Sequence, residues 1–378
     1  MARGKCRERN GVTLRDVATH AGVSPKTVSN VINNWPYVTP ETRQKVQQAI
    51  SALGYRPSTL ARSLVTGRTS TVGIVLPDIS NPFFGQAIRG CEDVLYAAGY
   101  SIILCNTDED LEKERRYLDL LIGRQVDALI LWGSRAASDT LASWLGDIPM
   151  VTVDCAGQPE RANATCIDVD NVGGALAATR HLVGRGHRRV AHLAGPSQRL
   201  TAQRRLAGYQ EALREAGLPY DPALVTEGLP SIRGGYRAAI QLLQAQKPTA
   251  LFCYNDLMAV GAMVACRHLG LSIPRDLALV GFDDIVLSSL VVPALTTMRI
   301  AQYELGKLAS ELVLERLRAA AMPAKTVLFP VQLQVRNSCG SRRLSKRQMR
   351  DILENLVTSI AVDLAPDVPT SNEGGGAG

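Results

Sequence analysis

The first 55 residues carry apolar side chains at the three- and four-residue spacing of helices, in three short runs. The third run begins at Thr39-Pro40-Glu41, a helix-start signal, and stops at Gly54. Three helices this short must share one small core. The expected inward positions are Val17, Ala18, Ala21 and Val23 in the first run, Val28, Val31 and Ile32 in the second, and Val46, Ala49, Ile50 and Leu53 in the third.

The residues between the first two runs predict a tight turn flanked by helix caps. Thr13 has the chemistry of an N-cap, and Asp16 three residues later closes a capping box. Gly22 is suited to positive φ, where a side chain is strained. Ser24 is a second N-cap, and Pro25 follows at the first helical position, which tolerates proline. The sequence therefore predicts a helix-turn-helix.

The outward face of the second predicted helix is short, polar and able to form hydrogen bonds. These properties suit a helix that reads base edges in the major groove of DNA. An ordinary helical hairpin with a solvated face remains an alternative on these residues alone, because short helix-turn-helix patterns occur by chance. The outward positions are Lys26, Thr27, Ser29, Asn30 and Asn33.

From residue 71 the pattern changes to buried apolar runs that alternate with amphipathic helices. Repeated β-α units of this length predict doubly wound parallel sheets, and two series of similar size predict two lobes with a cleft between them. The first series has strands at 71–77, 101–106, 127–132 and 149–154, with helices near 83–98, 110–123 and 138–146. The second has strands at 188–195, 224–228, 249–255 and 276–284, with helices near 171–184, 201–216, 231–245 and 255–269. A further helix near 298–325 and strands at 327–330 and 331–336 follow.

Charge is concentrated at one end of the chain. The 378 residues carry a net charge of +7, whereas residues 1–68 alone hold 11 lysines and arginines against 3 acidic residues. A basic first domain on a nearly neutral body indicates a localised contact with a polyanion. The length predicts two or three domains, and 46% hydrophobic residues is ordinary for a soluble protein.

The eight cysteines are scattered and form no C-x-x-C pair. This usage is typical of a reducing cytoplasm and predicts neither a disulfide framework nor a zinc site. The basic start lacks the apolar segment of a secretion signal, and no stretch approaches the roughly 20 apolar residues of a membrane span. We therefore expect a cytoplasmic protein without a membrane partner.

The run TLRDVATHAGVSPKTVSNVIN, followed by VTPETRQKVQQAISALGYRPSTLARSLVTGRT, resembles the headpiece and hinge of the LacI family of transcriptional regulators. Together with the core, the resemblance covers about residues 12–339 and implies a known architecture. An all-α helix-turn-helix headpiece (12–57) and a hinge (58–69) would precede an α/β core like periplasmic binding proteins (70–339). In that core the chain crosses between two doubly wound parallel-sheet lobes three times.

The resemblance implies sequence-specific binding of double-stranded DNA at a pseudo-palindromic operator by a homodimer, most simply as a repressor. Leu64 occupies the place of the hinge leucine that wedges into the minor groove in this family. Arginine is frequent in the family where this chain has Asn30, so the base preference differs there. The expected DNA-contacting residues are Thr13, Ser24, Pro25, Lys26, Thr27, Ser29, Asn30, Asn33, Tyr37 and Leu64.

An effector cleft is expected outside the carboxyl ends of the strands, where loops gather polar groups. Arg205, Asn255 and Asp283 offer a guanidinium fork, an amide and a carboxylate, a set that can pair vicinal hydroxyls or an anionic group. Asn255 and Asp283 are equally explained, one by one, as helix caps. The expected effector-binding residues are Asp78, Asn81, Phe83, Phe84, Asp154, Arg199, Thr201, Arg205, Asn255 and Asp283.

Two departures from the family bear on the effector. Cys155 stands where the purine repressor has a tryptophan, and Pro230 stands where an aromatic clamp is frequent. Without these flat platforms a purine is disfavoured, and a sugar, sugar acid or sugar phosphate is expected, with Phe84 available to stack on a ring. No cofactor or metal is expected: Asp283-Asp284 lacks a third ligand nearby, and no nucleotide-binding or zinc motif is present.

An enzymatic role is not expected. The rival interpretation is a sugar-binding or sugar-processing α/β protein with an incidental basic N-terminus. Residues 340–378 depart from shorter family members. An apolar stripe at Met349, Ile352 or Leu353, Leu356 and Ile360 predicts a helix, followed by a tail rich in glycine and proline. That helix either assembles dimers into tetramers or packs on its own core.

Overall fold

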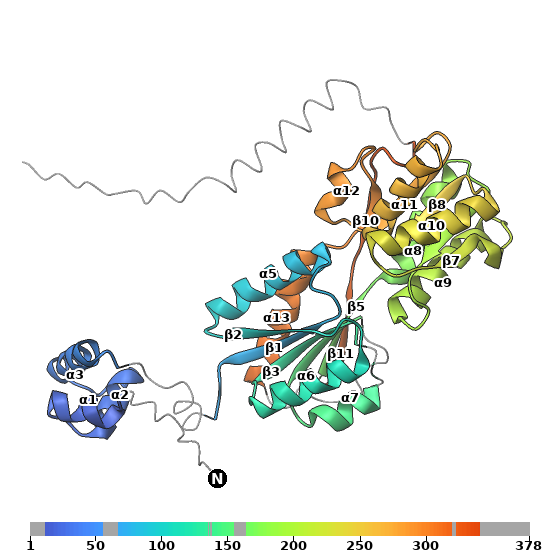
Figure 1. The fold of residues 1–378 in the computed structure, drawn as a ribbon. Helices are drawn as coiled ribbons and strands as arrows, with labels where there is room; N and C mark the ends of the chain where they lie inside the picture. Colours follow the sequence, from blue (N-terminus) through green and yellow to red (C-terminus); the bar gives the residue numbers. More distant parts are fainter. Residues whose placement is uncertain are drawn as a thin grey trace, which may run out of the picture.

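The structure is a computed structural model that describes residues 12–55, 67–134, 136, 138–154, 164–319 and 323–340. These residues form a small helical headpiece and a core of two lobes (Figure 1). The N-lobe holds the sheet that begins at residue 71, and the C-lobe holds the other. Leu64, Cys155 and the extension after residue 340 lie outside the described residues. No helix in the described ranges is both long and apolar enough to span a bilayer.

The headpiece has the three predicted helices, α1 (Leu14–Ala21), α2 (Pro25–Ile32) and α3 (Pro40–Leu53). The capping box is formed: the Thr13 hydroxyl accepts from the Asp16 amide at 3.3 Å, and the Asp16 carboxylate accepts from the Thr13 amide at 2.7 Å. Gly22 adopts φ 65°, as the predicted turn requires. The buried side chains of the headpiece are Val17, Ala18, Val28, Val31, Val46 and Ala49.

The N-lobe is a six-stranded, fully parallel sheet in the order β11-β5-β4-β3-β1-β2. Its first part is made of β1 (Thr71–Leu76), α5 (Pro82–Ala97), β2 (Ser101–Asn106), α6 (Leu111–Gly123), β3 (Ala128–Trp132), α7 (Ser138–Leu145), β4 (Met150–Val153) and β5 (Ala164–Val169). Late in the chain, α13 (Gln302–Arg318) and β11 (Lys325–Phe329) complete it.

The C-lobe sheet has the order β12-β10-β9-β8-β6-β7, and only β12 is antiparallel to its neighbour. Its elements are α8 (Asn171–Gly184), β6 (Val190–Ala194), α9 (Leu200–Glu215), a 3₁₀ turn (Pro222–Leu224), β7 (Val225–Glu227), α10 (Ile232–Gln246), β8 (Ala250–Cys253), α11 (Asp256–His268), β9 (Ala278–Asp283), α12 (Val286–Leu290), β10 (Thr296–Arg299) and β12 (Gln332–Gln334).

Three connections join the lobes, as the family resemblance implied: β5 to α8, β10 to α13, and β11 to β12. The predicted helix near 298–325 was wrong at both ends, because residues 296–299 form β10 and the helix covers Gln302–Arg318. Strands β5 and β10 and helix α12 were not predicted. In β10 the threonines are buried because their hydroxyls have partners: Thr297 donates to Asp256 at 2.6 Å.

Helices α5 and α13 of the N-lobe pack directly against each other through glycines. A Cβ at Gly90 would collide with the carbonyl oxygen of Tyr303, and a Cβ at Gly306 with that of Ala87. Backbone atoms cannot move aside as a flexible side chain can. The close approach of these two helices therefore depends on the absence of both side chains.

We expect Gly306→Ala to destabilise the core by about 1–3 kcal/mol, because one extra methyl group overpacks this contact. Gly85→Ala on α5 is the matched control: a Cβ there meets no atom within 4 Å, so the gain in helix propensity should leave stability unchanged or slightly raised. Urea unfolding followed by circular dichroism measures both. Equal stability of the two variants would contradict the packing argument.

Candidate functional site

The outward face of α2 separates into residues that hold the helix and residues that are unengaged. The Ser24 hydroxyl accepts from the Thr27 amide at 3.1 Å and lies 2.9 Å from the Thr27 hydroxyl, and the Asn33 amide donates to Ser29 at 3.4 Å. These side chains, like that of Thr13, are therefore already engaged in hydrogen bonds within the headpiece. Within the described residues, no partner is recorded for the side chains of Lys26 and Asn30.

A loop after α2 carries two exposed aromatic rings beside this face. Tyr37 is 86% exposed and Trp35 is 52% exposed, and their ring centroids lie 6.4 Å apart. Arg43 of α3 holds the loop by donating to the Trp35 carbonyl at 2.9 Å and to the Asn34 side chain at 3.2 Å. Trp35 was missed from the sequence, although a large apolar residue just past a reading helix is the kind of signal that indicates a contact surface.

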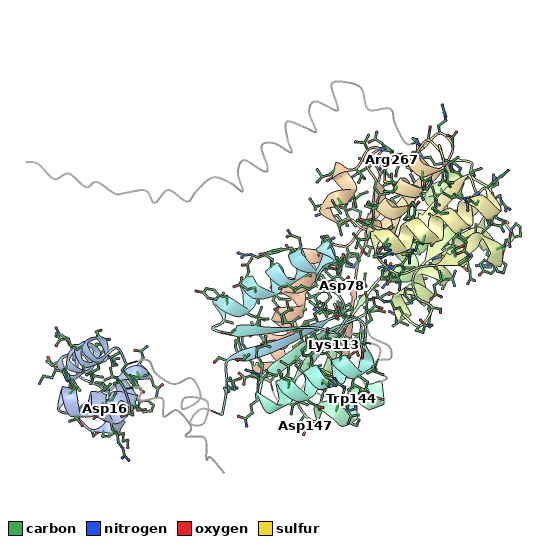
Figure 2. The ribbon with its side chains drawn as sticks, viewed as in Figure 1. Asp16, Asp78, Lys113, Trp144, Asp147 and Arg267 are labelled. Atoms are coloured by element: carbon green, nitrogen blue, oxygen red, sulfur yellow. The ribbon has the colours of Figure 1, made fainter. Side chains whose placement is uncertain are left out.

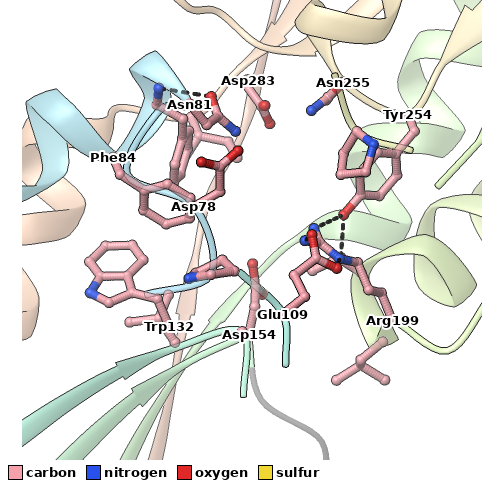
Figure 3. A pocket seen from close by; sticks show the side chains of 18 of the residues that line it. Asp78, Asn81, Phe84, Glu109, Trp132, Asp154, Arg199, Tyr254, Asn255 and Asp283 are labelled. Atoms are coloured by element: carbon pink, nitrogen blue, oxygen red, sulfur yellow. Dashed lines mark hydrogen bonds and ion pairs between the residues drawn. The ribbon is translucent and has the colours of Figure 1, made fainter. Parts of the chain in front are cut away.

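All ten residues predicted for the effector line one cavity between the lobes (Figure 3). The cavity encloses about 980 Å³, including the part open to solvent. In Figure 2, Asp78 lies near the junction of the two lobes, whereas Asp147 lies at the far end of the N-lobe. The structure thus brings together residues from sequence positions 78 to 283, which the sequence alone left in separate stretches.

The polar groups of the cavity come from strand ends, as predicted. Asp78 follows β1, Asp154 follows β4, Asn255 follows β8, and Asp283 is the last residue of β9. Asp154 has φ 53° and Asp283 has φ 115°, which are uncommon for residues with a side chain and point to functional constraint. Asn255 caps α11 by accepting from the Met258 amide at 2.9 Å, as the helix-cap alternative predicted, and it also lines the cavity.

Arg205 of α9 is the buried cation of the cavity, with only 4% of its surface exposed. Its guanidinium lies 3.7 Å from the ring centroid of Phe282 and 4.7 Å from that of Tyr254. It donates to the Asn171 side chain at 2.9 Å and to the Tyr254 carbonyl, and it lies 3.6 Å from the Asp283 carboxylate. The guanidinium therefore has partners on several sides before any ligand binds.

Burial raises the pKa of two carboxyl groups in the cavity. The pKa of Asp154 rises to about 6 and that of Asp283 to about 8, in both cases because desolvation disfavours the charged form. Arg205 opposes both shifts, but its distance of 3.6 Å from Asp283 is too long for a hydrogen bond and compensates only in part. Asp256, behind the cavity, adds negative charge near Asp283.

A second cation, Arg199, connects the two lobes at the cavity. It donates to Glu109 of the N-lobe at 2.8 Å through Nε and makes a further ion-pair contact through Nη2. It also donates to the Tyr254 hydroxyl at 3.2 Å, which lies 2.8 Å from the Thr201 hydroxyl (Figure 3). Glu109 and Tyr254 were missed from the sequence. Tyr254 adjoins the predicted Asn255, which is the only signal that marks it.

Aromatic rings cover one wall of the cavity. Phe83, Phe84 and Trp132 pack edge to face, with centroids 5.1–6.3 Å apart. Phe84 is only 9% exposed, so most of its ring face is used in this packing and the expectation that it stacks on a ligand fits Phe83 better. Pro230 lines the cavity as expected, and Trp132 and Tyr254 line it too, although each is at most 5% exposed.

The described residues contain no group of three or more His, Cys, Asp or Glu side chains that could hold a metal ion. The six cysteines they include are buried, and none of them is in a disulfide. What the cavity offers is hydrogen bonding: carboxylates, an amide and two guanidinium groups around an aromatic wall.

Comparison with known proteins assigns the architecture to a family. Residues 13–58 match the family described as bacterial regulatory proteins, lacI family, and residues 179–339 match a periplasmic binding protein-like domain. The transcriptional repressor PurR of Haemophilus influenzae (strain PittEE) is 39% identical over 308 residues, which cover 81% of this chain and 91% of PurR. The chain belongs to the lacI family.

Solved structures of the family agree over the whole fold. The lac repressor dimer bound to operator and the anti-inducer ONPF has a TM-score of 0.79 and 29% identity, covering 88% of this chain and all of that one. The regulator CelR in complex with cellobiose has a TM-score of 0.66 and 32% identity, covering 86% and 99%. The chain is therefore a DNA-binding transcriptional repressor with a ligand-binding core, and its relatives are regulators rather than enzymes.

Asn30→Ala should relax base preference at one position in each half-site, because the unengaged amide is then no longer present to pair with a base edge. The loss of discrimination is expected to be about 1–3 kcal/mol. Selection of bound duplexes from a random pool measures it, with Gln48→Ala on the exposed side of α3 as control. A profile for Asn30→Ala identical to that of the unmodified protein would make Asn30 an ordinary helix residue.

Proposed function

We propose that the protein represses transcription as a homodimer on a pseudo-palindromic operator and that a neutral, hydroxyl-rich sugar in the cleft controls its affinity for DNA. The observation that carries the proposal is the charge balance of the cavity. The guanidinium groups of Arg199 and Arg205 already have partners, while the carboxyl groups of Asp78, Asp154 and Asp283 also line the cavity. The domain division into 12–57, 58–69, 70–339 and 340–378 is part of the proposal.

The state of the arginines argues against an anionic effector. Arg199 is engaged by Glu109 and Tyr254, and Arg205 is engaged by Asn171, Asp283 and two aromatic rings. A guanidinium group binds a phosphate or carboxylate most strongly when it is free to donate two parallel hydrogen bonds. It would also meet carboxylates nearby. Sugar phosphates and sugar acids, which the sequence left open, are therefore disfavoured.

The carboxylate oxygens of Asp78 and Asp154 in the cavity favour a ligand with many hydrogen-bond donors. The Oδ1 atom of Asp78 accepts from Ser80, and that of Asp154 accepts from Val169 and Asn171. In the part of the chain that the structure describes, no hydrogen bond is recorded for the second oxygen of either carboxylate. Sugar hydroxyls can donate to both oxygens while the apolar face of the ring packs against the aromatic wall. The cellobiose complex of CelR supports this class.

An exposed apolar surface supports the homodimer. Tyr96 of α5, Val286 and Leu290 of α12, and Val292 are all more than half exposed. Helices α5 and α12 belong to different lobes and lie toward the same side of the core in Figure 1. A second copy that covers this side would contact both lobes, so closure of the cleft would change the interface. Leu64 of each copy would then meet at the operator centre.

The first experiment is selection of bound duplexes from a random pool at about 0.15 M salt, where non-specific phosphate binding is weak. We expect an enriched palindrome with a flexible pyrimidine–purine step at its centre. Deleting residues 1–68 should abolish specific binding and leave ligand binding intact. Enzymatic turnover of a sugar by the truncated core would favour the rival interpretation as a sugar-processing protein.

The effector class is tested by calorimetry with ribose, glucose and cellobiose against glucose 6-phosphate, gluconate and hypoxanthine. At least one neutral sugar should bind at least about tenfold more tightly than any anionic probe. Asp283→Asn should weaken that binding, whereas Asp147→Asn, an exposed aspartate far from the cleft in Figure 2, should not. Binding of glucose 6-phosphate or hypoxanthine in preference to the neutral sugars would overturn the assignment.

Sugar affinity should fall as the pH is lowered from 8.5 to 6. The pKa of Asp283 is raised to about 8 and that of Asp154 to about 6, and a hydroxyl donor favours the ionised carboxylate. Binding must therefore release protons, and affinity can weaken up to about tenfold per pH unit for each coupled group. Titrations in buffers of different ionisation enthalpy count the protons. Affinity that rises on acidification would contradict the sign of this linkage.

A further inference from the structure

Helix α6 runs along the N-lobe sheet from the cleft, at the carboxyl ends of the strands, to the amino ends of the strands. It follows the carboxyl end of β2 and precedes the amino end of β3, so it runs antiparallel to the strands. Its 13 residues extend over about 20 Å. Each end of α6 is bonded to a segment that is distant in sequence: the C-lobe at one end and the linker from the headpiece at the other.

At the cleft end, Glu109 connects α6 to the C-lobe. Its carboxylate receives the forked contact from Arg199 described above. The next residue, Asp110, caps the helix by accepting from the Lys113 amide at 2.9 Å. Inside the first turn, Ser134 donates to the buried Glu114. The interlobe ion pair is therefore attached closely to the start of the helix.

The position of this ion pair makes it sensitive to closure of the cleft. The connections between the lobes leave the N-lobe sheet from β5, β11 and α13. Among the described residues, a second ion pair between the lobes, Arg204 with Asp168, involves β5 next to such a connection. Glu109 follows β2, which is the edge strand four positions from β5 in the sheet. Rotation of the lobes about the connections therefore displaces the β2 edge of the sheet, which Glu109 follows, more than the β5 side.

At the other end of α6, a carboxylate holds the incoming linker. Asp127 accepts from two successive backbone amides, Thr69 at 3.0 Å and Ser70 at 2.8 Å. The Thr69 hydroxyl donates to the Gln125 carbonyl at 2.9 Å. The amide of Gln125 in turn donates to the Ile122 carbonyl in the last turn of α6 at 2.8 Å. The point where the linker enters the core is therefore bonded to the end of this helix.

The helix also rests directly on the strand that continues from the linker. Gly73 of β1 leaves space for Leu121 of α6, because a Cβ at residue 73 would lie only 2.8 Å from the Leu121 side chain. Leu121 of α6 is therefore in close contact with the backbone of β1. Shifts of about 1–2 Å of packed helices are a common element of conformational switching.

We propose that α6 transmits the state of the Glu109–Arg199 ion pair to the linker through Asp127, which makes Asp127 a positioning residue for DNA binding. The proposal rests on the proposed function, since it supplies a route by which the cleft changes the affinity for DNA. Asp127 does not line the cavity and belongs to the core, between α6 and β3, not to the headpiece. It acts by fixing Thr69 and Ser70, from which the chain leads back to the headpiece.

A double-mutant cycle on operator affinity tests the route in the ligand-free protein, using the duplex recovered by selection. Glu109→Gln should change the operator Kd by at least about fivefold, within the usual range of allosteric coupling. In the Asp127→Asn background the same substitution should change it by less than about twofold. Sites this far apart without a shared partner are otherwise additive. Additive effects, or no effect of Glu109→Gln, would overturn the proposal.

Two further variants separate positioning from folding. Asp119→Asn changes the same charge on an exposed position of α6, and Glu109→Gln should retain its full effect in that background. If Asp127→Asn fails to fold, Thr69→Val takes its place, because it removes the hydroxyl bonds to Gln125 and Asp127 and leaves the backbone bonds to Asp127. It should reduce the effect of Glu109→Gln by at least about half, and an unchanged effect would overturn the proposal.

Amide hydrogen exchange tests the same route without DNA or ligand, and so stands even if no operator is found. Glu109→Gln should change the exchange rates of the Thr69 and Ser70 amides by at least about fivefold, while Asp119→Asn should leave them within about twofold. A change at these two amides supports transmission through α6. Unchanged rates at residues 69 and 70 in Glu109→Gln would overturn it. Failure of the operator selection alone would count against the proposed function and not against this route.

Discussion

The buried guanidinium of Arg205 is the constraint on which the cleft depends. It lies between the rings of Tyr254 and Phe282 and bonds to Asn171, the first residue after a connection between the lobes. The guanidinium lies 3.6 Å from the buried carboxyl group of Asp283 and partly opposes the rise in its pKa that desolvation causes. The same cation therefore links α9 to the first residue of α8 and to the Tyr254 carbonyl at the cavity.

Some polar side chains of the headpiece form hydrogen bonds that stabilise its fold, and others remain available for contacts with DNA. Ser24 and Thr27 use their hydroxyls to start the reading helix, while Lys26 and Asn30 carry no recorded partner among the described residues. A helix of eight residues is marginal alone, so its start must be fixed locally and by the core beneath it. Lys26 and Asn30 therefore remain the residues of α2 that we expect to discriminate bases, and the neighbouring Tyr37 is 86% exposed.

The sequence predicted the β-α alternation well because parallel strands buried on both faces are nearly continuous apolar runs. It failed for β10, where Thr296 and Thr297 are buried through hydrogen bonds that only the folded chain supplies. The same distinction applies to the cleft. Residues at strand ends were found, whereas Glu109 belongs to the site only because Arg199 reaches it from the other lobe. Partners that depend on the placement of two lobes cannot be read from local pattern.

The late return of the chain to the N-lobe has a consequence for its synthesis. The N-lobe sheet starts at residue 71, yet its edge strand β11 and the packed helix α13 come after almost the whole C-lobe has been made. The headpiece, in contrast, is complete in sequence by Leu53. On the ribosome, the DNA-reading helices can therefore form while the core that regulates them still lacks a strand in each lobe. Neither lobe can finish folding as an independent unit, so any arrest of translation before residue 329 leaves both lobes unfinished.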